Sequence, residues 1–547
     1  MKKYIFGSCF LLATFFSSCE LDRLPTDAVV DEEFWKTEQD FQLACNALYL
    51  ELPTYSTRDE YSDICYGSSP NDFSSGTYLP TNDFGPWSDA YTNIATANKI
   101  IKFAQQNPFG LEENIVNRYE GEGCFFRALQ YYDLLRSYGG VPIIDKLLDV
   151  NSEELYAPRN SRSEVVRFIL DDLDFAIKSL PWPSELKDSD LGRFTKSAAY
   201  SLKSRIALYE GTRQKYVENG EYSELLRAAK DASFAVIKSG EHSLFTDISN
   251  DPLLNFQYCF MYEGEGSKES ILVNRYQKPW RKHNFSQQLL RGSENCPTRA
   301  IVDAFLCKDG LPIDVSSSFQ GYGTPTSEYQ NRDPRMSGSL MVPFDDLHWN
   351  DTPFEPRFSQ NESMTGYTWK KMAVIEDAKA LEGDLDVMLI RYAEVLLNYA
   401  EAVYELDNKI SDSDLSLSIN ELRHRVNMPD LTNAFVNGEN PANVVLNMQE
   451  EIRRERLVEL ANEGFRYDDL LRWGIAQDVL PKAMLGIPDL REYYQYVNAK
   501  VWDKVKSGFV ELQPASDRTF EDKHYLWPLP LVQMALNDNL EQNPGWN

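Results

Sequence analysis

The sequence has few of the residues that build metal or redox centres. Its eight cysteines include no CxxC pair, and no two of its five histidines (His242, His283, His348, His424 and His524) are close together. Zinc sites and thioredoxin-type chemistry use closely spaced ligands, so we expect neither a metal site nor a cofactor. The six cysteines after Cys19 are interpreted as buried small side chains.

Sequence motifs of the common enzyme classes are also missing. The chain has no GxSxG, HExxH, GxGxxG, Walker-type or calcium-loop pattern. This argues against the hydrolases, metalloproteases and nucleotide enzymes that use them. The paired carboxylates of a glycosidase leave no such pattern, and 84 acidic residues make chance pairs common. We predict no catalytic residue and expect a protein that is not an enzyme.

An excess of basic residues is absent as well. Acidic residues outnumber basic ones by 84 to 55, which gives a formal net charge of −29 at pH 7. Clustered Lys and Arg bind phosphate backbones, so nucleic-acid binding is not expected. The same excess of acid argues against a polybasic attachment to anionic lipid.

The chain lacks an apolar run long enough to cross a bilayer, which needs about 20 residues. Residues 4–16 form a shorter apolar run that follows two lysines and leads to Ser17-Ser18-Cys19. This arrangement predicts a lipoprotein signal peptide over residues 1–18, with ordinary secretion as the alternative. Acyl chains on Cys19 would then anchor the mature protein to a membrane.

Apolar residues with helical spacing occur in stretches that come in pairs. Positions 124, 128, 131, 135 and 138 step by four and three, and residues 165–180 and 390–404 repeat this spacing. Such spacing gives each helix one apolar stripe. We predict helices over residues 89–106, 112–138, 163–180, 195–210, 224–239 and 413–426, with Trp87 in the core. The pairs predict a mostly α fold of tetratricopeptide-like helical hairpins.

Between the two helical regions, residues 241–386 contain prolines, glycines and aromatic residues in place of helical periodicity. Irregular segments this long inside a domain are usually functional. Aromatic side chains in loops offer the flat faces that a sugar- or peptide-binding surface needs, although single aromatics more often attach a loop to the body. A second loop-rich stretch, residues 66–87, precedes the first predicted helix.

A charged block closes the second helical region. Glu455, Glu459 and Glu463 are four residues apart, so we expect them on one helix face, with neighbouring cations and an end at Gly464. The expected neutralising residues are Arg456, Arg466 and Arg472. We interpret the block as a structural ion-pair network rather than a catalytic carboxylate set. Residues 332–335 (Arg-Asp-Pro-Arg) are interpreted as a turn.

Four blocks spread along the chain resemble one family. They are Leu21-Asp22 with Pro25, Phe34-Trp35 and residues 46–49; Arg127-Ala128 with Tyr131 and residues 138–142; residues 390–402 with 455–473; and residues 528–530 with 539–546. Together they are similar to the SusD/RagB family of outer-membrane nutrient-binding lipoproteins. The resemblance implies one domain over residues 19–547, with a helical-repeat body (about 88–240 and 387–475), a loop-rich ligand-binding insertion with little strand (about 241–386) and a closing segment (about 476–547).

The resemblance also implies a function. A lipid-anchored protein on the external face of the outer membrane would capture an oligosaccharide or polysaccharide and deliver it to a partner TonB-dependent (SusC-like) transporter, acting as its lid. A peptide or other nutrient binder, or a protein-interaction scaffold, is the alternative. Glycan binding needs aromatic faces and polar groups for hydroxyls. The predicted ligand-binding residues are Trp280, Tyr276, Arg281, Arg291, Asn71, Asp72 and Tyr78, followed by Trp349 and Trp369.

Overall fold

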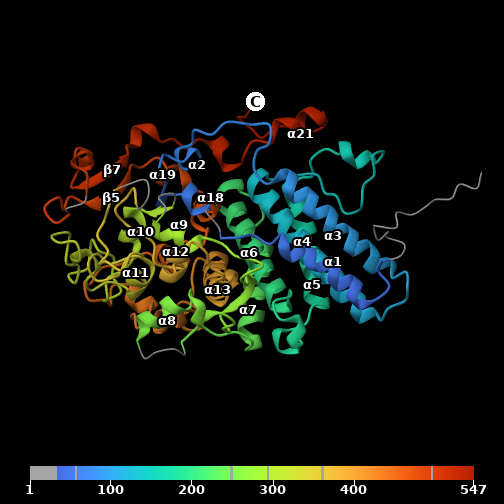
Figure 1. The fold of residues 1–547 in the computed structure, drawn as a ribbon, viewed down its shortest axis with the longest axis horizontal. Coiled ribbons are helices and arrows are strands. Elements are labelled where there is room, and N and C mark those ends of the chain that lie inside the picture. The colour runs from blue at the N-terminus through green and yellow to red at the C-terminus, as the bar shows by residue number, and fades with distance from the viewer. Residues whose placement is uncertain are drawn as a thin grey trace, which may run out of the picture.

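The computed structural model describes residues 34–55, 58–246, 251–291, 295–358, 363–494 and 497–546. Cys19 and the predicted signal peptide lie outside these residues. About 49% of the chain is helical and 8% is strand, which confirms the mostly α fold (Figure 1). None of the helices in the described ranges has both the length and the apolar composition needed to cross a membrane.

Helices from the first half of the chain pack against one another in sequence order. They are α1 (Glu38–Leu50), α2 (Asp72–Ser75), α3 (Trp87–Gln106), α4 (Glu113–Tyr138), α5 (Arg162–Ser179), α6 (Lys196–Arg213) and α7 (Ser223–Ser239). From α3 onward each packs on the next, and α7 packs on α13 (Tyr392–Asp407), near the centre of Figure 1. The first five predicted helices are confirmed to within a few residues, as is the tetratricopeptide-like arrangement.

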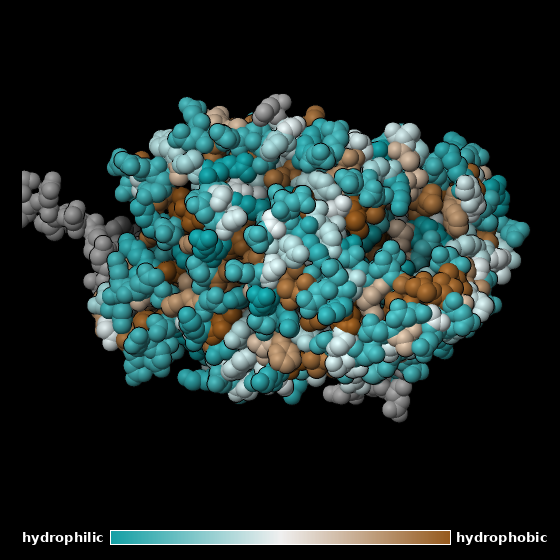
Figure 2. All heavy atoms as spheres, turned by 180° about the vertical axis from the view of Figure 1, so that it is seen from behind, coloured by the Kyte–Doolittle hydropathy of each residue, from teal (hydrophilic) through white to brown (hydrophobic). Residues whose placement is uncertain are grey.

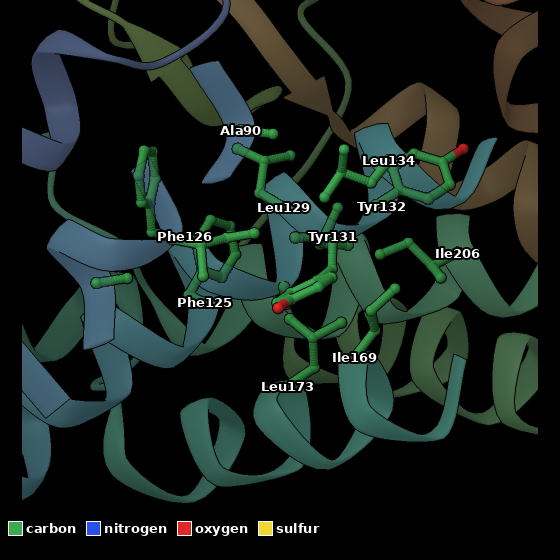
Figure 3. Close-up of a cluster of buried hydrophobic side chains, with 14 of the residues drawn as sticks. Ala90, Phe125, Phe126, Leu129, Tyr131, Tyr132, Leu134, Ile169, Leu173 and Ile206 are labelled. Carbon is green, nitrogen blue, oxygen red and sulfur yellow. The ribbon is translucent and has the colours of Figure 1, made fainter. Parts of the chain in front are cut away.

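The predicted apolar stripes meet in one core, shown in Figure 3. Leu134 of α4, Ile169 and Leu173 of α5 and Ile206 of α6 are all fully buried there. Residues on most sides of α4 are buried because α1, α3 and α5 all pack against it. Trp87 begins α3 and is 5% exposed, so its predicted place in the core is also confirmed. Apolar burial of this kind contributes about 25 cal/mol per Å².

The helix predicted over residues 413–426 is wrong in one respect, because the structure breaks it in two. The pieces are α14 (Asp412–Ser416) and α15 (Ile419–Arg425). Between them, Ser418 has φ −133° and ψ −92°, outside the helical region. Its hydroxyl donates to the carbonyl of Asp414 at 2.5 Å. Serine favours such local hydrogen bonds over helix continuation, which accounts for the break.

The loop-rich region, residues 241–386, contains short helices and strands. Its elements are α8 (Pro252–Tyr258), β2 (Ser270–Asn274), α9 (Phe285–Arg291), β3 (Cys296–Pro297), α10 (Arg299–Ala304), α11 (Pro334–Ser339) and α12 (Ile375–Ala380). Antiparallel pairing joins β3 to β1 (Cys65–Tyr66) and β2 to β4 (Val387–Arg391), which leads directly into α13. The β2–β4 pair therefore attaches this region to the helical body.

The last part of the chain crosses the whole molecule. Its elements are α16 (Asn433–Val436), α17 (Met448–Glu459), α18 (Arg466–Arg472), α19 (Ala476–Val479), β5 (Met484–Pro488), α20 (Ala499–Trp502), β6 (Val505–Lys506), β7 (Phe509–Gln513) and α21 (Leu531–Leu536). β5, β7 and β6 form an antiparallel sheet in that order. The red segment then runs along the top of Figure 1 to α21. Trp527 and Trp546 pack in the core of α3–α6, so the end of the chain closes the fold.

The charged block forms a buried ion-pair network, as predicted, but its partners differ from those expected. The pairs are Glu455 with Arg335 and Arg423, Glu459 with Arg335, Arg391 and Arg425, and Glu463 with Arg391 and Lys371, all at 2.5–3.0 Å. The expected cations bind other acids: Arg456 binds Asp469, Arg466 binds Asp63 and Arg472 binds Glu401. Arg456 directly follows Glu455, and consecutive helical residues point about 100° apart, so it faces away from the network.

The network lowers the pKa values of its carboxylic acids. Burial alone would raise the pKa of Glu459, but Arg425, Arg391 and Arg335 hold it well below its ordinary value. The segment around Arg335, interpreted above as a turn, thus supplies a central cation of the network. Removing one member of such a buried pair leaves an uncompensated charge, which costs about 3–5 kcal/mol.

The prediction that Gly464 ends the helix carrying these acids is wrong. α17 ends at Glu459, so Glu463 lies beyond it. Asn462 takes the left-handed conformation first, with φ 65°, and Gly464 follows with φ 82°. Asparagine tolerates this conformation better than most residues. The early turn places Glu463 within 2.7 Å of Arg391.

The six cysteines in the described residues are buried and form no disulfide, in agreement with the sequence interpretation: Cys45, Cys65, Cys124, Cys259, Cys296 and Cys307. The surface seen from behind in Figure 2 is mainly hydrophilic, with hydrophobic residues in small separate patches. This surface agrees with the strongly negative net charge and with a core that holds most of the apolar side chains.

Candidate ligand-binding site

Three of the predicted ligand residues lie on a hairpin that follows β2. Gln277 and Arg281 each donate a backbone N–H to the other's carbonyl, both at 2.9 Å. Within the turn, Trp280 donates its N–H to the carbonyl of Gln277 at 3.1 Å. Tyr276 precedes the turn and Arg281 ends it. Backbone hydrogen bonds therefore fix Trp280 and Arg281 directly, and Tyr276 is next to Gln277, which they also fix.

The segment that leads into β4 supports this hairpin from outside. The side chain of Asp384 accepts the backbone N–H of Lys278 at 3.0 Å, and that of Asp386 accepts the N–H of Tyr276 at 2.7 Å. The ammonium group of Lys278 also forms an ion pair with Asp384 at 3.4 Å. Because these bonds hold the hairpin without a ligand, a ligand would lose little free energy to ordering it.

Trp280, at the tip of the hairpin, is 82% exposed. The other nine of the ten tryptophans are buried or half-buried. An indole offers one of the largest apolar surfaces of any side chain, and its full exposure to water is unfavourable. A rigid turn that presents such a ring provides a flat face on which a ligand can stack.

Arg281 follows Trp280 in the chain, and its side chain is also fixed in position. Its Nη1 donates to the side chain of Asn274 at 2.5 Å and to the carbonyl of Arg275 at 3.0 Å. Its guanidinium lies 4.5 Å from the ring centre of Tyr276, within cation–π distance. Tyr276 is half-buried, so its ring gives the guanidinium of Arg281 a fixed surface to stack on.

A groove of about 430 Å³ adjoins the hairpin. Its walls come from α1, from the turn at residues 189–193 and from the end of β2, which Asn274 ties to the carbonyls of Leu52 and Pro53. Its polar side chains are Gln42, Asn46, Ser189, Arg193, Asn274, Arg275 and Arg281, and its apolar side chains include Tyr49, Leu50 and Leu191. This size and this mixture are typical of small-ligand sites.

Two further predicted residues form a separate pair. The guanidinium of Arg291, at the end of α9, lies 4.0 Å from the ring centre of Trp349. Trp349 is half-buried, and its indole N–H has no hydrogen-bond partner in the described structure. No hydrogen bond, ion pair or ring contact between described residues joins this pair to the Trp280 hairpin.

Asn71 and Asp72 have structural roles at α2. Asn71 is the N-cap of this helix and accepts the backbone N–H groups of Phe73 and Ser74 at 2.9 and 3.2 Å. Asp72 accepts the hydroxyl of Thr77 at 2.9 Å and remains exposed. N-cap side chains contribute about 1 kcal/mol to helix stability, so the local fold accounts for Asn71.

For Trp369 and Tyr78 the structure corrects the prediction. Trp369 is fully buried in a core cluster of the loop-rich region, and Tyr78 is 6% exposed, stacked 4.6 Å from Phe73. Burial of each ring among apolar side chains stabilises the loops and leaves no ring face for a ligand. These two aromatics attach loops to the body, which is the alternative role that the sequence leaves open for any single aromatic residue.

The opposite wall of the groove is not apparent from the sequence. Gln42, Asn46, Ser189 and Arg193 lie far from the hairpin along the chain, and no local pattern connects them. The fold brings them together through β2, which passes the end of α1. Arg275 is different, because it directly precedes the predicted Tyr276 and could have been included with it.

Comparison with known proteins identifies the fold. A model of the SusD family matches residues 256–546, which is more than half of the chain. A second model, described as SusD-like and as starch-binding associating with outer membrane, matches residues 57–208. The two matches together cover most of the described chain and leave out residues 209–255, which include α7.

Individual relatives agree with these models. SusD-like protein P38 of Formosa agariphila is 27% identical over 85% of this chain and 90% of its own. A SusD-like carbohydrate-binding protein from Bacteroides fragilis has a TM-score of 0.74 at 22% identity, over 93% of this chain and 100% of its own. A laminarin-binding SusD-like protein has a TM-score of 0.62 at 20% identity, over 93% and 100%. With the family model matched over more than half of its length, the chain belongs to the SusD family.

Proposed function

We propose that this protein binds glycans at the cell surface, with the Trp280 hairpin and its groove as the binding site. The observation that carries the proposal is the 82% exposure of Trp280 on a turn held by backbone hydrogen bonds. Sugars present an apolar C–H face that stacks on an indole ring. The amide, hydroxyl and guanidinium groups of the groove supply hydrogen bonds for sugar hydroxyls.

The family relationship supports this proposal. Among similar structures are one described as a carbohydrate-binding protein and one described as laminarin-binding. In the proposed division of the chain, residues 241–386 carry the Trp280 hairpin as an insertion into the helical body, and residues 476–547 close the domain. The ligand site then lies where the insertion meets α1.

We propose a binding role without catalysis. Glycoside hydrolysis normally uses two carboxylates on opposite sides of the scissile bond. The charged side chains that line the groove are arginines, and no Asp or Glu is among its described lining residues. Prolonged incubation of the protein with a bound glycan should therefore release no shorter products, as judged by chromatography.

Isothermal titration calorimetry of the purified full-length chain against oligosaccharides and peptides tests the proposal. We expect heat of binding with at least one glycan, and Trp280→Ala should weaken that affinity by about 10-fold, in line with about 1–3 kcal/mol for an aromatic stacking contact. Tyr156→Ala is a matched control, because Tyr156 is 59% exposed but does not line this groove. Peptide binding without glycan binding would favour the alternative nutrient class and reject the glycan proposal.

We further propose that Cys19 carries the lipid anchor and holds the protein on the external face of the outer membrane. The family model described as associating with outer membrane supports this location. In cells, the wild type should label with a fatty-acid analogue and fractionate with outer membranes, whereas Cys19→Ala should do neither. Labelling of the Cys19→Ala variant would place the anchor elsewhere.

The proposed partner is a TonB-dependent, SusC-like transporter over which this protein acts as a lid. Glycans too large to diffuse through the outer membrane need a pore, and a surface binder without a pore delivers nothing to the cell. Affinity purification from membranes of the native organism should recover a transporter barrel together with this chain. Recovery of the protein alone at low salt, where surface contacts persist, would contradict the proposed pairing.

A further inference from the structure

The groove beside the hairpin is basic, although the protein as a whole is strongly acidic. Its three charged lining side chains are Arg193, Arg275 and Arg281, while the chain has a formal net charge of −29. A local reversal of charge in a concave site focuses the electrostatic field and attracts ligands of the opposite sign. The identity of the ligand therefore depends on how far each arginine is already neutralised.

Arg193 is neutralised within the protein. Its guanidinium forms a two-pronged pair with the fully buried Glu122 at 2.6 and 2.9 Å, and it donates to Asn46 at 2.8 Å. A second carboxylate behind the groove, Asp190, is 6% exposed and pairs with Arg118 at 2.9 Å. This wall thus presents fixed hydrogen-bonding groups with little net charge.

Arg275 and Arg281 are different. Arg275 is 60% exposed and comes only within 3.5 Å of Asp386, a contact that water weakens. Arg281 forms no ion pair with any described residue. Its Nη1 is used by Asn274 and by the carbonyl of Arg275, whereas its Nε and Nη2 form no hydrogen bond within the described structure. The stacking of Arg281 on Tyr276 holds these two donors in place.

We propose that this groove selects glycans that carry an anionic group, with Arg281 as the main specificity-determining residue and Arg275 as a second cation. The inference rests on the proposed glycan-binding function and adds the chemical class of the ligand. A neutral sugar would displace water from Arg281 without compensating its charge, which is unfavourable. A uronate carboxylate or a sulfate ester would bind its planar pair of donors and neutralise it. Trp280 would stack on the same sugar or on its neighbour.

The first experiment compares matched ligands on the full-length protein. An array of neutral, uronic-acid and sulfated oligosaccharides identifies the binders, and calorimetry then measures each binder beside its methyl ester or desulfated form. We expect the anionic form to bind at least 10-fold more tightly, because hydrogen bonds to charged groups are the stronger ones. The carboxylate and sulfate arms of the array decide which group is the natural one. Raising sodium chloride from 50 to 500 mM should weaken only the anionic ligand.

The second experiment uses variants of Arg281. Arg281→Gln should reduce affinity for the anionic ligand by roughly 10- to 100-fold and leave affinity for its neutralised form within about threefold. Arg281→Lys keeps the positive charge but lacks the planar pair of N–H donors, so it should recover part of the lost affinity. Arg491→Gln is the matched control, since Arg491 is 54% exposed, pairs with Asp489 and does not line the groove. Its affinities should equal those of the wild type.

The outcomes separate this inference from the function on which it rests. If neutral glycans bind and their anionic relatives bind equally or less well, the selectivity for anions is wrong and the glycan-binding function stands. Equal losses for charged and neutralised ligands in Arg281→Gln would also reject it, because they would show general damage to the site. If no glycan of any class binds, the proposed function itself fails.

Discussion

The helix-pair region (residues 87–239) and the loop-rich region (residues 241–386) are held together in different ways. In the helix-pair region, side chains such as Leu134, Ile169 and Leu173 fill a continuous apolar core between successive helices. The loop-rich region has its own apolar cluster, but it is also joined to the rest of the molecule by buried charges. Arg335 and Lys371 both reach carboxylates or carbonyls at the end of α17.

This difference follows from the length of the elements. Helices of about 17–26 residues satisfy their own backbone and bury broad apolar faces against one another, so apolar packing joins successive helices. Buried ion pairs such as Arg127 with Asp172 add to that packing. Elements of two to seven residues, such as β3 and α9, cannot bury a stripe and leave many backbone groups without a regular partner. Charged side chains that bind several acceptors at once then fix the geometry of the loops, and each is costly to remove.

The largest effect is expected from Arg391→Met. Arg391 is 1% exposed and contacts Glu269, Glu459 and Glu463 at 2.7–2.9 Å, so its loss takes one cation away from three buried carboxylates at once. We expect a loss of about 3–5 kcal/mol in the free energy of unfolding, measured by urea denaturation. Arg491→Met, at an exposed ion pair, is the control and should cost less than about 0.5 kcal/mol. Similar losses in the free energy of unfolding for the two variants would mean that the buried network stabilises the fold no more than an exposed ion pair does.

In the helix-pair region the corresponding change is Leu173→Ala. Leu173 is fully buried in α5, and its truncation leaves a cavity between helices that cannot close. The expected loss is about 2–5 kcal/mol in the free energy of unfolding. Leu43→Ala on α1, where the side chain is 54% exposed, should be nearly neutral. A small effect at Leu173 would show that this core is more loosely packed than the structure indicates.

The two regions also differ in how far the sequence predicts them. Periodic apolar positions such as Leu135 and Ile169 are sufficient to place helices, because burial of one stripe decides the structure. The break at Ser418 and the early end of α17 are missed because one hydroxyl hydrogen bond or one left-handed asparagine decides them. The partners of Glu459 are missed because Arg335 and Arg391 come from distant parts of the chain.

The candidate site is predictable to a similar degree. Trp280 and Arg281 stand out because an aromatic residue and a cation occur together in an irregular segment. Their setting, including the groove wall from α1, depends on tertiary contacts that no local pattern encodes. Exposure is equally hidden in the sequence: Trp280 and Trp369 are both loop tryptophans, yet one is 82% exposed and the other fully buried.

Acidification should distinguish charge-based from apolar stabilisation. Burial alone would raise the pKa of Glu401, but its pairing with Arg472 lowers the pKa to about 2, whereas it is near 4.5 in the unfolded chain. A depressed acid pKa contributes stability that is complete above about pH 4.5 and is lost as the pH falls towards 2. Between pH 4.5 and 2, the free energy of unfolding of the wild type should therefore fall by about 1.4 kcal/mol per pH unit more than that of Glu401→Gln.

Urea midpoints at pH 7, 5, 4 and 3.5 provide the measurement. Leu173→Ala serves as the reference, because removing a methyl-rich side chain changes no titrating group. Its stability should run parallel to that of the wild type at every pH, while the gap between the wild type and Glu401→Gln narrows below pH 4.5. Parallel curves for all three proteins would place the acid sensitivity elsewhere.

The smallest effect on stability is expected from Trp280→Ala, whose counterpart in the loop-rich region is the buried Trp369. Trp280 is 82% exposed, so its removal takes little apolar area out of the core. The free energy of unfolding, measured by urea denaturation, should change by less than about 0.5 kcal/mol. Trp369→Ala removes the same ring from a fully buried position and should cost about 3–5 kcal/mol. A large loss of stability in Trp280→Ala would show that the indole packs against the protein, and the hairpin would then be a structural element with no free face for a ligand.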